Sequence, residues 1–128
     1  SRIGKITLSG DNANKMLAML TEALRIADDD RYTYSQPNRY GEFQYDCSSF
    51  VSRLYKEYFN ITTPGTTAQY GSQYRVGREG EVELQPVEIY IGNGLRVGAH
   101  GDSLPTKDQI SVESYTRGHF TDVYRFVQ

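Results

Sequence analysis

The feature that most constrains this chain is the regular alternation of apolar and polar residues over 87–100, VEIYIGNGLRVGAH. Alternation with a period of two places the apolar residues of 87–91 on one face of a strand. It places those of 95–99 on one face of a second strand, and the glycines between them favour a tight turn. We therefore predict an antiparallel hairpin with one face buried.

The register of this hairpin follows from the requirement that both apolar faces meet the same core. They do so if Ile91 pairs with Leu95, which leaves Gly92-Asn93-Gly94 as a three-residue connection. A two-residue turn at Asn93-Gly94 pairs Ile91 with Arg96 instead and mixes the faces. We predict the three-residue turn. The opposite face of the hairpin is then made by Glu88, Tyr90, Arg96, Gly98 and His100.

A helix is predicted over residues 11–27, with Asp11 or Asn12 as its N-cap. The acidic run Asp28–Asp30 ends it, and we interpret this run as a solvated helix end and not as a calcium site. Its apolar residues recur at helical spacing. They are Met16, Leu17, Leu20, Leu24 and Ala27.

A second helix is predicted from about Asp46 to Phe59, after an ordered loop over residues 31–45. Cys47, the only cysteine of the chain, lies in its first turn on the same side as the apolar stripe. Residues 60–80 are rich in turn formers, and a last strand is predicted within 121–128. The stripe consists of Phe50, Val51, Leu54, Tyr55 and Tyr58.

Two helices followed by antiparallel strands predict one α+β domain over residues 1–128. The formal net charge of −2 makes duplex nucleic acid and anionic membranes poor partners. No segment is apolar enough to span a bilayer, and the first ten residues lack the apolar run of a signal peptide. The eleven tyrosines suit a polar cleft for sugars or peptides, and equally half-buried strand positions.

Cys47 is either a small buried hydrophobe or a nucleophile. A thiol attacks a carbonyl as the thiolate, which a helix N-terminus stabilises and an imidazole assists. His100 lies on the polar face of the hairpin and can approach the helix start, whereas His119 falls in a glycine-bearing turn. One cysteine and two histidines have no metal-ligand spacing, so we expect neither a metal nor a cofactor.

Three motifs carry a resemblance to a known family. They are RYTYSQ at Arg31–Gln36, NRYG at Asn38–Gly41 and YDCSSFV at Tyr45–Val51. Together with VEIYIGNG and VGAH they resemble the NlpC/P60 cysteine peptidase superfamily, in particular the phage-type peptidoglycan amidohydrolases, or endolysins. The likeness covers roughly residues 17–126, and the Tyr-Asp-Cys-Ser sequence that opens an apolar helix is its most specific part.

The resemblance implies a papain-like core, in which N-terminal helices pack on an antiparallel sheet. It implies that Cys47 is the nucleophile and that Tyr45, Asp46 and Ser48 line the substrate-recognition side of the cleft. Asp46 has an independent role as the N-cap of the helix. The implied activity is cleavage of an amide bond in the bacterial cell wall, either within stem peptides or between muramic acid and L-alanine.

The chain departs from this family directly before the hairpin. Relatives have a Gly-Asp pair, a strand and a histidine there, whereas Pro86 runs straight into Val87. We interpret the junction as a stretch missing before Val87, and the absence of tryptophan fits this interpretation. Relatives also carry a third polar residue where this chain has Gly98. His100 then either orients a base held in the missing stretch or is itself the base, with weak or no activity expected.

We therefore expect a bacteriolytic thiol hydrolase that acts outside the cell on peptidoglycan, alone or fused to a wall-binding domain. Two other classes remain open. One is an inactive wall-binding or interaction module on the same fold, favoured by the missing histidine. The other is a papain-like transferase or toxin, because a fold alone does not determine a function.

Overall fold

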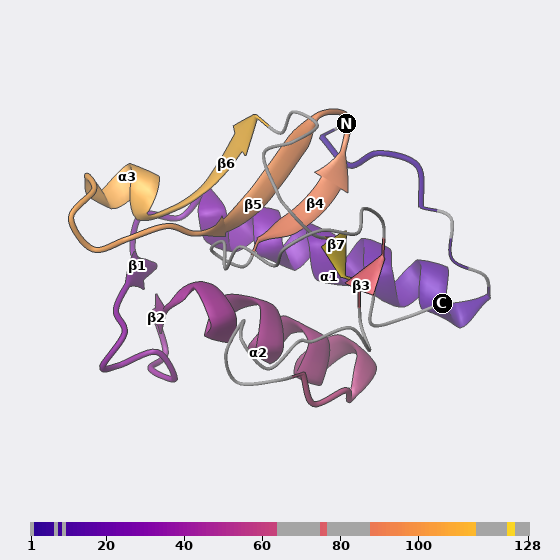
Figure 1. Cartoon of the computed structure of the whole chain (residues 1–128), viewed down its shortest axis with the longest axis horizontal. Helices are drawn as coiled ribbons and strands as arrows, with labels where there is room; N and C mark the ends of the chain where they lie inside the picture. Colours follow the sequence, from indigo (N-terminus) through magenta and orange to yellow (C-terminus); the bar gives the residue numbers. More distant parts are fainter. Residues whose placement is uncertain are drawn as a thin grey trace.

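A computed structural model of the chain describes residues 2–6, 8, 10–63, 75–76, 88–114 and 123–124. Helices and short strands alternate irregularly along it, which confirms the predicted α+β class (Figure 1). The elements are α1 (Asp11–Ala27), β1 (Thr33–Tyr34), β2 (Gln44–Tyr45), α2 (Cys47–Phe59), β3 (Arg75–Val76), β4 (Ile89–Gly92), β5 (Leu95–Ala99), α3 (Thr106–Gln109), β6 (Ile110–Ser114) and β7 (Val123–Tyr124).

The main sheet has the strand order β4-β5-β6, with both pairs antiparallel. Helices α1 and α2 pack against one another, and both also contact β5 (Figure 1). The apolar sides of both helices and of the sheet therefore share one core. Its fully buried large side chains include Met19, Ile26, Phe50, Leu54 and Val97.

Helix α1 has the predicted bounds but a different cap, and its predicted apolar face is confirmed in part, since Leu20 and Leu24 are buried. Its N-cap is Gly10, with a positive φ of 58°. Asp11 lies inside the first turn, where the helix dipole stabilises a carboxylate. Leu17, predicted to face the core, is 48% exposed. Met19, Ala23 and Ile26 are buried instead, because the helix packs on α2 along one side and on β5 and β6 along another.

Helix α2 confirms its predicted span, with Asp46 as N-cap and Asn60 as a left-handed C-cap at φ 54°. Its predicted stripe faces the core, since Phe50, Val51 and Leu54 are buried along with Tyr55, and Tyr58 is half-buried. The 31–45 segment before it, predicted as a loop, contains the short parallel pair β1–β2. That pairing is non-local and left no periodic signal in the sequence.

The hairpin corrects the predicted turn and confirms the predicted faces. Gly92 pairs with Leu95 across a two-residue turn, and Asn93 and Gly94 both have the positive φ angles, 55° and 72°, that such a turn requires. A β-bulge at Ile91 then restores the alternation, so that Ile89 lies opposite Val97. The three-residue connection is therefore wrong. A bulge achieves the same burial of both apolar faces.

Two elements beyond the hairpin were not predicted. Helix α3 leads into β6, which completes the sheet by pairing with β5, with Val112 opposite Val97 and Ile110 opposite Ala99. Strand β7 pairs with β3, which confirms a strand within 121–128. Pro86, Val87 and the proposed gap between them lie outside the described residues, as does His119.

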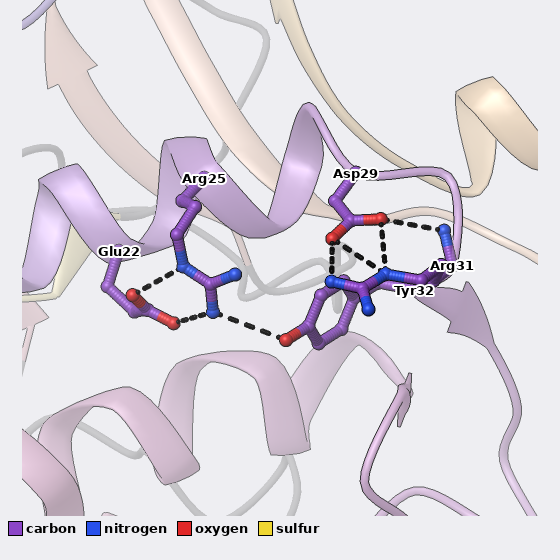
Figure 2. Close-up of polar contacts among 5 residues, drawn as sticks. All are labelled: Glu22, Arg25, Asp29, Arg31 and Tyr32. Carbon is purple, nitrogen blue, oxygen red and sulfur yellow. Dashed lines mark hydrogen bonds and ion pairs between the residues drawn. The ribbon is translucent and has the colours of Figure 1, made fainter.

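Polar contacts at the C-terminal end of α1 hold the chain as it turns towards β1 (Figure 2). Arg25 pairs with Glu22, and its Nη2 donates to the Tyr32 hydroxyl at 3.2 Å. Arg31 Nη2 lies 2.7 Å from Asp29 Oδ2. These contacts fix Tyr32 at the entrance to the 31–45 segment.

A series of aromatic side chains in contact, here called the aromatic chain, runs from Tyr32 to the start of α2. The Tyr32 ring lies 5.1 Å from that of Phe43 and 6.1 Å from that of Tyr45, centroid to centroid. Tyr45 in turn meets Phe50 of α2 edge-on at 5.5 Å. This chain of rings connects the end of α1 to the segment that carries Cys47.

Candidate active site

The start of α2 is built around the carboxylate of Asp46. Its Oδ1 accepts the Ser49 backbone N–H at 2.8 Å and the Ser48 hydroxyl at 3.1 Å. Ser49 Oγ accepts the Asp46 backbone N–H at 2.9 Å in return, which completes a capping box. Asp46 is buried, so the first turn of the helix is held by groups within the fold.

Cys47 is the first residue of α2, with a free and half-buried side chain. Among the described residues, no acceptor is recorded for the backbone N–H groups of Cys47 and Ser48. Unpaired N–H groups at a helix N-terminus attract negative charge through the helix dipole. The thiol therefore lies where an anion, or the oxygen of a polarised carbonyl, is electrostatically favoured.

The segment in front of α2 is fixed by two arginines. Arg53 donates to the backbone oxygens of Arg39 and Gln44, at 3.0 and 2.8 Å, and its guanidinium lies 4.1 Å from the centroid of the Tyr45 ring. Arg39 reaches Asp46 Oδ2 at 3.9 Å. Arg53 thus holds the backbone before α2 by two hydrogen bonds, and Arg39 forms an ion pair with the N-cap carboxylate.

Tyr34 of β1 lies on another side of this site. It pairs with Tyr45 in the parallel β1–β2 ladder. The pKa of its phenol is raised, first by burial and then by electrostatic interaction with Cys47, Asp46 and Asp102. Its hydroxyl therefore stays protonated at neutral pH, as a hydrogen-bond donor.

The residues that the family resemblance assigns to substrate recognition are all buried. Tyr45 is part of the aromatic chain, Asp46 is the N-cap, and Ser48 donates to it. The structure therefore gives each of them a partner inside the fold. Sequence reasoning identified this cluster through the YDCS motif and, for Asp46, through the cap.

His100 lies directly after β5 and belongs to a second polar cluster. Its Nε2 bonds to one oxygen of Glu88, and Arg96 Nη1 donates to the other. Glu88 is only 2% exposed at its side chain, on the sheet face predicted to be polar. The carboxylate fits there because it leans over Gly98, where a Cβ would meet Glu88 Cγ at 2.7 Å.

The charges of this cluster stabilise one another. For Glu88, burial opposes ionisation, but the hydrogen bonds from His100 and Arg96 outweigh it and the pKa is lowered. For His100, burial opposes protonation, but the bond to Glu88 outweighs it and the pKa is raised. Sequence analysis placed both residues on one face but gave Glu88 no role, because its pairing depends on the register.

The structure does not connect His100 to Cys47 by a hydrogen bond within its described part. While Nε2 contacts Glu88, Nδ1 lies 3.1 Å from Ser111 Oγ and 3.4 Å from the Asp108 carbonyl oxygen. Both ring nitrogens are therefore engaged with sheet and α3 residues.

Among the residues that the structure describes, no group of three or more His, Cys, Asp or Glu could hold a metal ion. None of the described helices is both long and apolar enough to cross a membrane. No family model matches the chain, and no curated protein matches it significantly. The resemblance to NlpC/P60 peptidases therefore rests on the residue motifs alone.

Proposed function

We propose that this chain is a cysteine hydrolase of the papain-like NlpC/P60 type that cleaves an amide bond of bacterial peptidoglycan. The observation that supports this most directly is the position of Cys47. The single cysteine is the first residue of α2, partly exposed and held by a buried N-cap, within a YDCS motif. The start of a helix is one of the positions at which proteins place nucleophilic thiols.

In the proposed reaction, the Cys47 thiolate attacks the scissile carbonyl carbon, and the Cys47 backbone N–H donates to the oxyanion. An imidazolium protonates the amine as the C–N bond breaks, which leaves a thioester on Cys47. The neutral imidazole then removes a proton from water, which attacks the thioester. The products are an amine and a carboxylate, and the thiol is regenerated.

His100 has one of two roles in this proposal. If a stretch with a histidine is missing before Val87, that histidine is the base and His100 orients it. If nothing is missing, His100 is the base, and one of its contacts with Glu88 or Ser111 has to open for it to serve Cys47. The mass of the intact protein distinguishes the two, because a missing stretch makes it heavier than the 14.6 kDa of this sequence.

The engagement of both His100 ring nitrogens favours a second candidate, an inactive wall-binding module on the same fold. Such a module sediments with purified cell walls and releases nothing from them. A hydrolase releases new free amino groups from the stem peptides or from L-alanine. A papain-like transferase or toxin leaves the wall intact and acts on another amide or acyl bond. Amino-group analysis of treated walls separates these outcomes.

The test of the proposed nucleophile is the substitution Cys47→Ala, compared with the wild-type chain in clearing a suspension of Gram-positive cell walls. We expect the variant to lose clearing completely, because no other side chain can form the thioester. Iodoacetamide treatment of the wild type should have the same effect. Circular dichroism should show that both proteins keep the fold.

A matched control is Ser52→Ala, a half-buried position further along α2. We expect Ser52→Ala to clear walls like the wild type. Clearing by Cys47→Ala at the wild-type rate would reject the nucleophile role.

We propose that the activity is exerted outside the producing cell, at the wall, with or without a fused wall-binding domain.

A further inference from the structure

The side chain of Gln109, the last residue of α3, joins segments that are distant in the sequence. Its Oε1 accepts the backbone N–H of Tyr34 at 2.9 Å. Its Nε2 donates to the carbonyl oxygens of Leu104 at 2.9 Å and of Asp102 at 3.4 Å. Its own backbone oxygen accepts the His100 N–H at 2.7 Å. One residue thus binds β1, the loop after β5 and the strand end that carries His100.

The bond to Tyr34 connects Gln109 with the strand pair that precedes the candidate nucleophile, Cys47. Tyr34 is opposite Tyr45 in the parallel β1–β2 pair, and α2 begins two residues after Tyr45 with Cys47. The β1 backbone is thus attached to the segment that enters α2 on one side and to Gln109 on the other. Helix α3 also packs on β1. Only the β1–β2 pair separates Gln109 from the segment that begins α2. A movement of Gln109 would therefore change the position of Cys47.

We propose that Gln109 is a positioning residue of the candidate active site. The bond from Tyr34 N–H to Gln109 Oε1 sets the position of β1 beside Cys47 relative to the strand end that carries His100. This inference deepens the proposed hydrolase function and rests on it. A glutamine suits the position because one amide accepts from a backbone N–H and donates to backbone oxygens at the same time.

Two substitutions distinguish the role of the amide oxygen of Gln109, which accepts from Tyr34, from that of its amide nitrogen. Gln109→Ala removes both the acceptor and the donor. Gln109→Glu keeps an acceptor for Tyr34 N–H but replaces the donor with a carboxylate oxygen near the 102 and 104 carbonyl oxygens. The control is Gln36→Ala, because Gln36 is exposed in the same 31–45 segment and only its backbone oxygen is recorded in a hydrogen bond.

The first measurement is the rate of Cys47 alkylation by iodoacetamide at fixed pH, which needs no catalysis. We expect Gln109→Ala to raise this rate several-fold, because β1 then keeps its backbone bonds to β2 but loses the bond to Gln109, and is less firmly held near the half-buried thiol. The second measurement is turnover of a soluble stem-peptide substrate. Here we expect a fall in kcat of about tenfold with little change in KM, since a small misplacement of catalytic groups mainly affects the transition state. Gln109→Glu should restore both values towards the wild type, and Gln36→Ala should not alter them.

The proposal is overturned if Gln109→Ala alkylates and turns over like the wild type. It is also overturned if Gln109→Glu is as impaired as Gln109→Ala, because the loop contacts would then be the important ones. Amide hydrogen exchange at Tyr34 adds a measurement that does not need the alanine variant, with protection expected in both the wild type and Gln109→Glu. If the wild type hydrolyses nothing, the hydrolase proposal fails, while the alkylation rates still decide whether Gln109 positions β1 beside Cys47.

Discussion

At the scale of single residues, Glu88 is a carboxylate whose burial is stable only with charged or hydrogen-bonded partners. A buried carboxylate is costly unless it is paired, and both oxygens of Glu88 are paired, one with Arg96 and the other with His100. The arrangement requires Gly98 across the strand pair, since any side chain there would collide with Glu88. The absence of a side chain at Gly98 thus leaves room for the cluster of Glu88, Arg96 and His100.

Glu88→Gln should destabilise the protein in a pH-dependent manner. Folding raises the pKa of His100, so its ionic contribution is complete below about pH 6.5 and is lost as pH rises through the folded value. Folding lowers the pKa of Glu88, so its contribution is complete above about pH 4.5 and is lost as pH falls through the folded value. We expect the loss of unfolding free energy to be about 3 kcal/mol near pH 6 and smaller at both extremes.

Urea unfolding at several pH values measures this difference, with the exposed Glu57→Gln as the control. An NMR titration of the His100 ring adds a direct test, because the pKa of His100 should fall in Glu88→Gln. A destabilisation that is the same at every pH would show that the charge of Glu88 is not what stabilises the cluster.

At the scale of elements, the capping box decides where α2 begins and hence where the thiol lies. Asp46→Ala removes the acceptor of the Ser49 N–H and the partner of the Ser48 hydroxyl. We expect it to lower the free energy of unfolding by about 1–2 kcal/mol, the upper part of the range for N-caps, because the site is buried. Urea denaturation measures this value.

Asp46→Asn is the matched control, since its amide oxygen still caps the helix. We expect it to retain most of the stability that Asp46→Ala loses. Equal stability of the alanine variant and the wild type would contradict the role assigned to this cap.

The elements that sequence analysis predicted correctly are those with local signals. The span of α2 follows from helical periodicity and from a capping residue, and the hairpin faces follow from alternation. The β1–β2 pair and β6 were missed because each pairs across a longer connection, residues 35–43 or 100–109, and not across a tight turn with its own sequence signal. The turn was wrong because periodicity alone cannot distinguish a longer connection from a two-residue turn with a bulge at Ile91.

At the scale of the whole molecule, the candidate site is made by two groups of elements. The β1–β2 pair and α2 carry Tyr34 and Cys47, while the sheet and α3 carry His100 and Gln109. Sequence analysis identified the cysteine and the histidine separately, from a helix start and from a strand face. It could not determine which neighbour each ring nitrogen of His100 would have, because that depends on how the elements pack.

The two groups share one hydrophobic core, and this has a measurable consequence. Leu54 of α2 is 2% exposed, and α2 packs on both α1 and β5. Leu54→Ala should lower the free energy of unfolding by about 2–5 kcal/mol, because it leaves a cavity where the helices and the sheet meet. If the core is shared, the loss is global, so urea transitions followed by far-ultraviolet circular dichroism and by tyrosine fluorescence should shift together.

Leu17→Ala provides the matched comparison, since the same side chain is removed from a position that is 48% exposed. About half of the Leu17 surface stays in contact with water after folding, so we expect a loss of about 1 kcal/mol or less. A large loss in Leu17→Ala would mean that this face of α1 is covered in solution. Separate transitions for the two probes in Leu54→Ala would mean that the helices and the sheet unfold independently. Cys47 and His100 would then not be held at a fixed separation by the core.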